Sequence, residues 1–235
     1  MSIHDFEKPS VTVDIVTLKA VNTYINSKKG PGKALSILLV KRDEEPFKNK
    51  WSLPGGFVNV NENLEDKAKS KLLEKTGVKD LYLEQLYTFS DINRDPRGRV
   101  ISVAYMALTN DEKLNQDIIS ASKETKWFTI NDNTLISEDE TINIKDLAFD
   151  HQNIIKTALS RLNGKIEYTD VAFHLLPHKF TIKEIQLLFE CIMGYRIDSF
   201  QRKMGNRIIE TDEIIKVVGR PARLFIFNKE WKYGL

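Results

Sequence analysis

The chain has 235 residues, of which 41% are hydrophobic and 29% are charged, and its formal net charge is +2. This length supplies a core for one large domain or two modest ones, and the composition is typical of a soluble globular protein, which excludes disordered and fibrous classes. The longest apolar runs fall far short of the roughly 20 residues of a membrane span. The N-terminal residues show no secretory signal, and the single cysteine, Cys191, cannot form an internal disulfide, so we expect a cytoplasmic protein.

The small net charge hides a difference between two parts of the chain. Residues 1–150 hold 21 basic and 24 acidic side chains, a net of −3, whereas residues 151–235 hold 14 and 9, a net of +5. A basic C-terminal part favours a polyanionic partner for that part alone, although ordinary solvated surface also accounts for a difference of this size. We predict two domains, 1–150 and 151–235.

Strands dominate the predicted N-terminal part. Alternating apolar residues at Val11, Val13 and Ile15 predict one strand, and the apolar run 35–40 predicts another, after a polar loop at 26–33. Apolar residues at helical spacing then predict an amphipathic helix over 63–76 that ends at Gly77. The elements expected after it are strand 81–89, turn 95–98, strand 100–108, strand 125–130 and a helix over 145–162.

The C-terminal part has a different order of elements. Thr181 and Glu184 form a capping box in front of a helix that ends at Gly194. Asp198 or Ser199 can cap a second, short helix that contains residues 200–204. Apolar runs at 208–209, 214–218 and 224–227 predict strands around a basic turn at 219–221. Helix, turn, helix and ribbon is the order of a winged helix-turn-helix.

One segment carries a specific motif. The pattern Gly56-x5-Glu62-x7-Ser70-Lys71-Leu72-Leu73-Glu74-Lys75-Thr76-Gly77-Val78 resembles the Nudix box, a loop-helix-loop signature, and its spacing is complete. In that family, clustered carboxylates on the helix hold Mg²⁺, which neutralises a diphosphate and activates water. The resemblance implies a Nudix-like mixed-sheet α/β/α sandwich for residues 1–150.

The residue types in this box depart from the family pattern. Ser70 replaces the family's arginine, and Lys71 and Lys75 replace two of its glutamates, which leaves Glu74. Positions 71, 74 and 75 share one helical face, so two ammonium groups occupy the places of metal-binding carboxylates. We expect diphosphate hydrolysis to fail and no metal cofactor to be required. The two lysines either are simply solvated or contact a bound phosphate directly.

Further ligand-binding candidates surround this helix. The loop Arg94-Asp95-Pro96-Arg97-Gly98-Arg99 resembles the loop that follows the box in ADP-ribose-type Nudix proteins, and forked arginine donors there can hold a diphosphate or sugar hydroxyls. A turn stabilised by Asp95 with exposed arginines is an equally open interpretation. The full set of predicted ligand-binding residues is Arg42, Gly55, Gly56, Glu62, Lys71, Glu74, Lys75, Arg94, Arg97 and Arg99.

The segments 180–186, 200–204 and 219–225 resemble the winged-helix half of Nudix-related transcriptional regulators, bacterial proteins in which a degenerate Nudix domain senses an effector. In that family the second helix of the helix-turn-helix enters the major groove and the wing contacts the DNA backbone or minor groove. The resemblance assigns DNA binding to Gln201, Arg202, Lys203, Arg207, Arg220 and Arg223, although ordinary helix surface remains the alternative for Arg202 and Lys203.

These observations combine into one functional hypothesis. The chain is expected to be a homodimeric bacterial transcriptional regulator, with a Nudix-like α/β domain that senses ADP-ribose or a pentose-related effector and a winged helix, within 151–235, that binds operator DNA. One alternative is a Mg²⁺-dependent hydrolase of the ADP-ribose pyrophosphatase type, in which Glu62 and Glu74 gather metal with carboxylates outside the box. The other is a C-terminal part that serves only in dimerisation or protein binding.

Overall fold

The N-terminal part of the chain forms a mixed β-sheet. The computed structural model describes residues 7–24, 32–79, 81–114, 124–217 and 220–232. Within these ranges nine strands form one sheet in the order β5–β6–β1–β2–β7–β8–β9, with β3 paired to β2 and β4 paired to β1. The strands are β1 Ser10–Thr23, β2 Gly32–Lys41, β3 Trp51–Ser52, β4 Gly55–Phe57, β5 Tyr82–Phe89, β6 Val100–Thr109, β7 Thr125–Asn131, β8 Thr134–Ile136 and β9 Thr141–Asn143. β1 runs parallel to β6 and antiparallel to β2.

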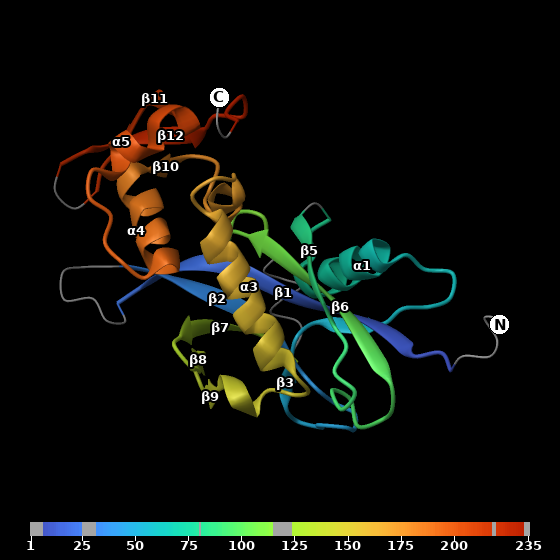
Figure 1. Cartoon of the computed structure of the whole chain (residues 1–235). Coiled ribbons are helices and arrows are strands. Elements are labelled where there is room, and N and C mark those ends of the chain that lie inside the picture. The colour runs from blue at the N-terminus through green and yellow to red at the C-terminus, as the bar shows by residue number, and fades with distance from the viewer. Residues whose placement is uncertain (1–6, 25–31, 80, 115–123, 218–219, 233–235) are drawn as a thin grey trace.

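Helices cover both faces of this sheet. Successive strand residues point to opposite faces, so Ile15 of β1 packs with α1 (Leu64–Thr76), whereas Val16 belongs to the larger cluster that contains residues of α3 (His151–Lys165). Figure 1 shows α3 running across the sheet and α1 beside β5 and β6. This arrangement confirms the predicted α/β/α sandwich.

The C-terminal part is a winged helix, as predicted. It contains a three-stranded sheet in the order β10–β12–β11. Its elements are η3 Val171–Leu175, β10 Phe180–Thr181, α4 Ile182–Met193, α5 Phe200–Met204, η4 Gly205–Arg207, β11 Ile208–Ile215 and β12 Ala222–Phe227. One continuous cluster of buried side chains extends from the large sheet through α3 to Phe189 of α4, so the two parts pack against each other (Figure 1).

The predicted ends of the Nudix-box helix and of the first C-terminal helix are confirmed. The N–H of Gly77, which is left-handed with φ 72°, donates to the Leu73 carbonyl at the end of α1. Thr181 and Glu184 form both bonds of the capping box at the start of α4, which ends at the left-handed Gly194. Ser199 occupies the N-cap position of α5, but its side chain forms no capping hydrogen bond.

Several predicted boundaries are wrong. The helix expected over 145–162 begins at His151, because Phe149 has φ 53° and separates it from a 3₁₀ turn, η2, at Ile144–Asp146. The loop expected at 26–33 falls mainly outside the described residues, and its last two, Gly32 and Lys33, already pair with β1. The runs 208–209 and 214–218 do not form separate strands: Ile208, Ile209, Ile214 and Ile215 lie in one bulged strand, β11, which ends at Ile215.

The strands β3, β4, β8 and β9 have only two or three residues each, too short for an alternating pattern to be visible in the sequence. The turn predicted at 95–98 is present, with Gly98 at φ 147°. Among the described residues, no helix combines the length and apolar character needed to cross a membrane.

Candidate functional site

A cavity of about 480 Å³ opens on the N-terminal part, where the box helix, the Gly-Gly strand and the start of α3 meet. Such a volume suits a small nucleotide-sized ligand. The lining combines residues from sequence segments far apart in the chain: Thr12, Asp14, Val40, Lys41, Arg42, Asp43, Glu44, Ser52, Leu53, Pro54, Gly55, Gly56, Phe57, Lys71, Glu74, Lys75, Arg94, Asp95, Arg97, Glu124, Phe149 and His151. Of the predicted ligand-binding residues, Glu62 and Arg99 are absent from this lining.

The box helix presents ion-paired side chains to the cavity. Lys71 Nζ lies 2.7 Å from Glu74 Oε2, and Lys75 Nζ lies 2.9 Å from Glu74 Oε1. The hydrogen bonds from Lys71 and Lys75 lower the pKa of the Glu74 carboxyl, so it remains ionised at neutral pH. Both carboxylate oxygens of Glu74 therefore already have ammonium partners.

Gly55, Gly56 and Glu62 have local structural roles. A Cβ at Gly55 would lie 2.3 Å from the Val13 carbonyl oxygen, so only glycine allows β4 to approach β1 this closely. A Cβ at Gly56 would instead meet the flexible Lys71 Cε at 3.4 Å. Glu62 Oε2 accepts hydrogen bonds from Asn59 and lies 3.2 Å from Lys67 Nζ, outside the cavity.

The three loop arginines differ in what their side chains contact. Arg97 is paired with Asp95 through its Nε and Nη2 atoms, at 3.0 and 2.7 Å, and its guanidinium also lies over the exposed ring of Phe57. Arg99 donates to the carbonyl of Ser90. Arg94 is buried in the cavity lining, and its Nε and Nη2 atoms donate to the carboxylates of Asp14 and Asp150. The three therefore do not form a common cluster of free donors.

Arg94 is the centre of a buried polar network in the cavity wall. Its guanidinium donates to Asp150 at 2.7 and 3.0 Å and to Asp14 Oδ2 at 3.3 Å. Asp14 Oδ2 also accepts from Ser102 Oγ, and His151 Nε2 lies 3.4 Å from Asp14 Oδ1. Burial by itself would raise the pKa of Asp14, but His151, Ser102 and Arg94 together lower that pKa to about 2. This network ties β1 to the start of α3.

Aromatic rings and Arg42 form another wall of the cavity. The Arg42 guanidinium lies 4.8 Å from the ring centre of Phe149, and its Nε donates to the Pro46 carbonyl at 2.8 Å. Phe149 has φ 53°, a conformation that costs free energy for a residue with a Cβ and is often retained at ligand sites. Phe149 also packs edge to face with Phe47, which likewise has positive φ. No pattern in the sequence marks Phe149, because backbone strain at a single residue leaves no periodic signal.

In the C-terminal part, α5 exposes its three predicted DNA-binding residues. Gln201, Arg202 and Lys203 are exposed between the buried residues Phe200 and Met204. Gln201 lines a groove of about 500 Å³ between α4, α5 and the wing strands, together with Arg223 of β12 and residues that sequence analysis missed, Lys183 and Gln186 of α4. Lysine, glutamine and arginine side chains of this groove can donate hydrogen bonds to a nucleic acid, although acidic and apolar residues, Glu210, Ile182, Ala222 and Phe225, also line it.

The wing places its arginines differently. Arg220 is exposed, and Arg223 Nη1 lies 2.6 Å from Glu210 Oε1. The prediction that Arg207 contacts DNA is wrong: its guanidinium is buried and donates to the carbonyls of Ile166, Glu167 and Thr169, at the end of α3 and just beyond it. Only tertiary packing shows this role, because nothing in the sequence Gly205-Asn206-Arg207 distinguishes a buried arginine from an exposed one.

Comparisons with known proteins agree with both parts of this description. Residues 17–153 match the family described as NUDIX domain, and residues 172–227 match the NrtR DNA-binding winged helix domain. The chain belongs to the NrtR family of Nudix proteins. Its relative in Acinetobacter baylyi, the ADPR responsive transcriptional repressor NtrR, is 36% identical over 229 residues, which are 95% of this chain and 84% of the relative.

Further relatives of this NrtR-family member cover the whole chain or only its Nudix part. The crystal structure of Shewanella oneidensis NrtR complexed with a 27mer DNA has a TM-score of 0.73 and 32% identity, and the match covers 93% of each chain. ADP-ribose pyrophosphatase of Methanocaldococcus jannaschii is 35% identical over 130 residues, 54% of this chain and 68% of the relative. The two NrtR-type relatives match both the Nudix part and the winged-helix part, whereas the pyrophosphatase matches only about half of the chain. The complete chain is therefore similar to the regulators.

Proposed function

We propose that this protein is an ADP-ribose-responsive transcriptional repressor that binds operator DNA through its winged helix, in the bacterial cytoplasm. The observation that carries the proposal is the similarity of nearly the whole chain, both parts together, to a repressor described as responsive to ADP-ribose. The cavity of about 480 Å³ supports it, because cationic side chains, a glycine-rich strand and aromatic rings line one space of nucleotide size.

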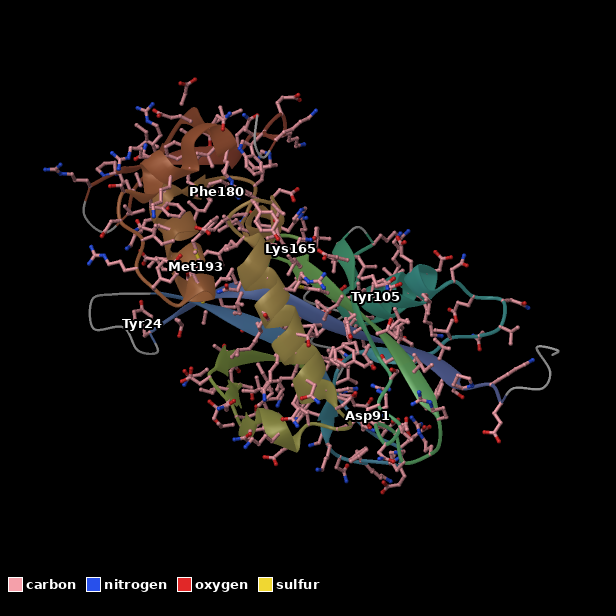
Figure 2. All side chains as sticks on the ribbon, viewed as in Figure 1. Tyr24, Asp91, Tyr105, Lys165, Phe180 and Met193 are labelled. Carbon is pink, nitrogen blue, oxygen red and sulfur yellow. The ribbon has the colours of Figure 1, made fainter. Side chains whose placement is uncertain are left out.

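The helix α3 offers a physical connection between cavity and DNA-binding part. Its first residue, His151, lines the cavity, and the carbonyl of Ile166, directly after its last residue, accepts a hydrogen bond from Arg207 of the winged helix. In addition, Asn163 Nδ2 donates to the Ile192 carbonyl of α4 at 2.7 Å. Figure 2 shows Asp91 of the cavity-side loop and Phe180 of the winged helix beyond opposite ends of α3, with Lys165 at the end nearer Phe180. An effector that binds the cavity more tightly when α3 is in one placement than in another would change the fraction of the protein that is competent to bind DNA.

A DNA-binding titration tests this function. Fluorescence anisotropy with the DNA upstream of the protein's own operon should show tight binding that weakens about 5- to 150-fold when ADP-ribose is added, the usual range for coupled sites. The Arg202→Ala,Lys203→Ala variant should lose DNA affinity and salt dependence but keep ADP-ribose binding, because both residues are exposed on α5, in the winged-helix part. A scrambled DNA of equal length is the control. Equal affinity for operator and scrambled DNA, or no response to ADP-ribose, would contradict the proposal.

We further propose that two copies bind a near-palindromic operator, with half-sites separated by about one helical turn or a multiple of it. Light scattering of the protein–DNA complex measures this stoichiometry directly. A complex containing a single copy would contradict the dimer.

Hydrolysis is the second candidate because the Nudix part also resembles an ADP-ribose pyrophosphatase. Phosphate-release assays with ADP-ribose and Mg²⁺, coupled to a phosphatase, test it with Glu74→Gln as the matched variant. We expect no turnover above the Glu74→Gln background, since both oxygens of Glu74 are bound to lysines. Turnover that disappears in Glu74→Gln would favour the enzyme.

A further inference from the structure

The Nudix fold implies Mg²⁺ on the box helix, but the side chains present here do not fit this ion. Mg²⁺ requires oxygen ligands in near-octahedral geometry, and ammonium groups cannot coordinate it. Lys71 and Lys75 occupy two of the family's carboxylate positions, and the remaining carboxylate, Glu74, is bound to both of them. In the described part of the chain, no three His, Cys, Asp or Glu side chains are grouped so that they could share a metal ion.

Instead of carboxylates, α1 carries a row of lysines with four-residue spacing. Lys67, Lys71 and Lys75 recur every four residues, so they share one helical face. Lys67 pairs with Glu62 at 3.2 Å, and the other two pair with Glu74. Three ammonium groups thus pair with two carboxylates, which leaves this helix row with a net positive charge, although the cavity lining as a whole holds as many acidic as basic side chains. A metal-dependent Nudix site needs negative charge on this helix face to attract its cation.

The cavity side of this row is built to meet an anion. Lys71 and Lys75 line the cavity, and their side chains are 28% and 20% exposed, whereas that of Glu74 is 47% exposed and therefore more open to solvent. Gly56, which has no side chain, lets Lys71 pack against β4. Each ammonium group has three donors, and the contact with Glu74 uses one of them, so donors remain for a ligand.

We propose that Lys71 and Lys75 replace Mg²⁺ and bind the diphosphate of the nucleotide effector directly, so that effector binding needs no divalent cation. The identity of the effector as ADP-ribose rests on the proposed function, whereas the lysine–diphosphate contact does not. A phosphate group accepts charge-assisted hydrogen bonds from ammonium donors, and a low-polarity surface such as the nearby aromatic wall strengthens them.

Isothermal titration calorimetry of the full chain tests this proposal with two probes, ADP-ribose and inorganic pyrophosphate, each in EDTA and in Mg²⁺. The Kd of wild type in EDTA should lie within about twofold of its Kd in Mg²⁺. The Lys71→Gln,Lys75→Gln variant should lose about 10- to 100-fold in affinity, as expected for two charge-assisted bonds. Lys69→Gln is the matched control, because Lys69 is 53% exposed, pairs with Glu65 and lies outside the cavity.

A charge-reversed variant gives a second readout. Lys71→Glu,Lys75→Glu restores the carboxylate pattern of the family, and its ADP-ribose binding should become dependent on Mg²⁺. Thermal melts of all variants in the absence of ligand show whether each is folded. Binding of wild type that disappears in EDTA, or an unchanged Kd in the folded glutamine variant, overturns the proposal. If pyrophosphate binds wild type but not the glutamine variant, and ADP-ribose binds neither, the lysine–diphosphate contact is supported and ADP-ribose is excluded as the effector.

Discussion

Replacing Arg94 by Met should destabilise the protein more than replacing any exposed arginine. The Arg94 side chain is 3% exposed, and the side chains of its partners Asp14 and Asp150 are 10% and 15% exposed. Removing one member of a buried ion pair typically costs about 3–5 kcal/mol, because the remaining charge is left without a partner. Asp14 keeps Ser102 and His151, so we expect the lower end, about 3 kcal/mol.

Urea unfolding and thermal melts at pH 7.5 measure this effect. For a chain of this size, about 3 kcal/mol corresponds to a decrease in Tm of roughly 6–12 °C. The matched control is Arg99→Met, since Arg99 is exposed and donates to the Ser90 carbonyl, and its free energy of unfolding should change by no more than about 0.5 kcal/mol. Equal stability of the two variants would refute the structural role of the network.

The pH dependence gives an independent check on the same network. The folded state lowers the pKa of Asp14 from 3.8 to about 2, so this carboxylate contributes stability above pH 3.8 and loses it as the pH falls toward 2. The shift corresponds to roughly 2–3 kcal/mol. Wild type should therefore lose stability steeply between pH 4 and pH 2, and Asp14→Asn should show a flatter profile in that window. An unchanged slope in Asp14→Asn would contradict the pKa assignment.

Further predictions concern three packing features. Arg207→Lys keeps the charge but cannot reach the carbonyls of Ile166, Glu167 and Thr169 together, so it should lower the free energy of unfolding by about 2–3 kcal/mol in urea titrations. Wild-type stability of this variant would show that the hydrogen bonds of the Arg207 guanidinium are dispensable. Gly55→Ala should cost about 1–3 kcal/mol or more through the clash with β1, whereas Gly56→Ala should cost less than half as much; equal Tm values would contradict the close approach. Thr181→Ala should cost about 1 kcal/mol through loss of the α4 cap, and thermal melts would detect no change if the cap were irrelevant.

Local sequence patterns were sufficient where a structural feature depends on neighbouring residues. The helix α1 follows from apolar spacing and Gly77, and α4 follows from the capping box at Thr181, because both signals act within one or two helical turns. The lysines of the box were also predictable, since the fixed spacing from Gly56 places them on one helix face. Long β1 was underestimated, because its second half depends on pairing with β2 and β6.

Within the candidate sites, the roles of arginines could not be predicted from spacing. Arg94, Arg97 and Arg99 are close in sequence, yet one is buried between two carboxylates, one is paired within its turn and one contacts a backbone carbonyl. Arg207 followed the predicted recognition helix but serves to hold the end of α3. Each outcome depends on which groups the fold brings within about 3 Å, and sequence separation carries no information about that distance.

The amino-acid sequence alone determined the order of the longer helices and strands and the replacement of acidic by basic side chains on the box helix, because these depend on residue identity and short-range geometry. The tertiary structure decided which charges are neutralised in the interior and which remain available to a ligand. That distinction requires burial and partner distances, since a charged side chain removed from water is stable only when opposite charges or hydrogen-bonding groups surround it.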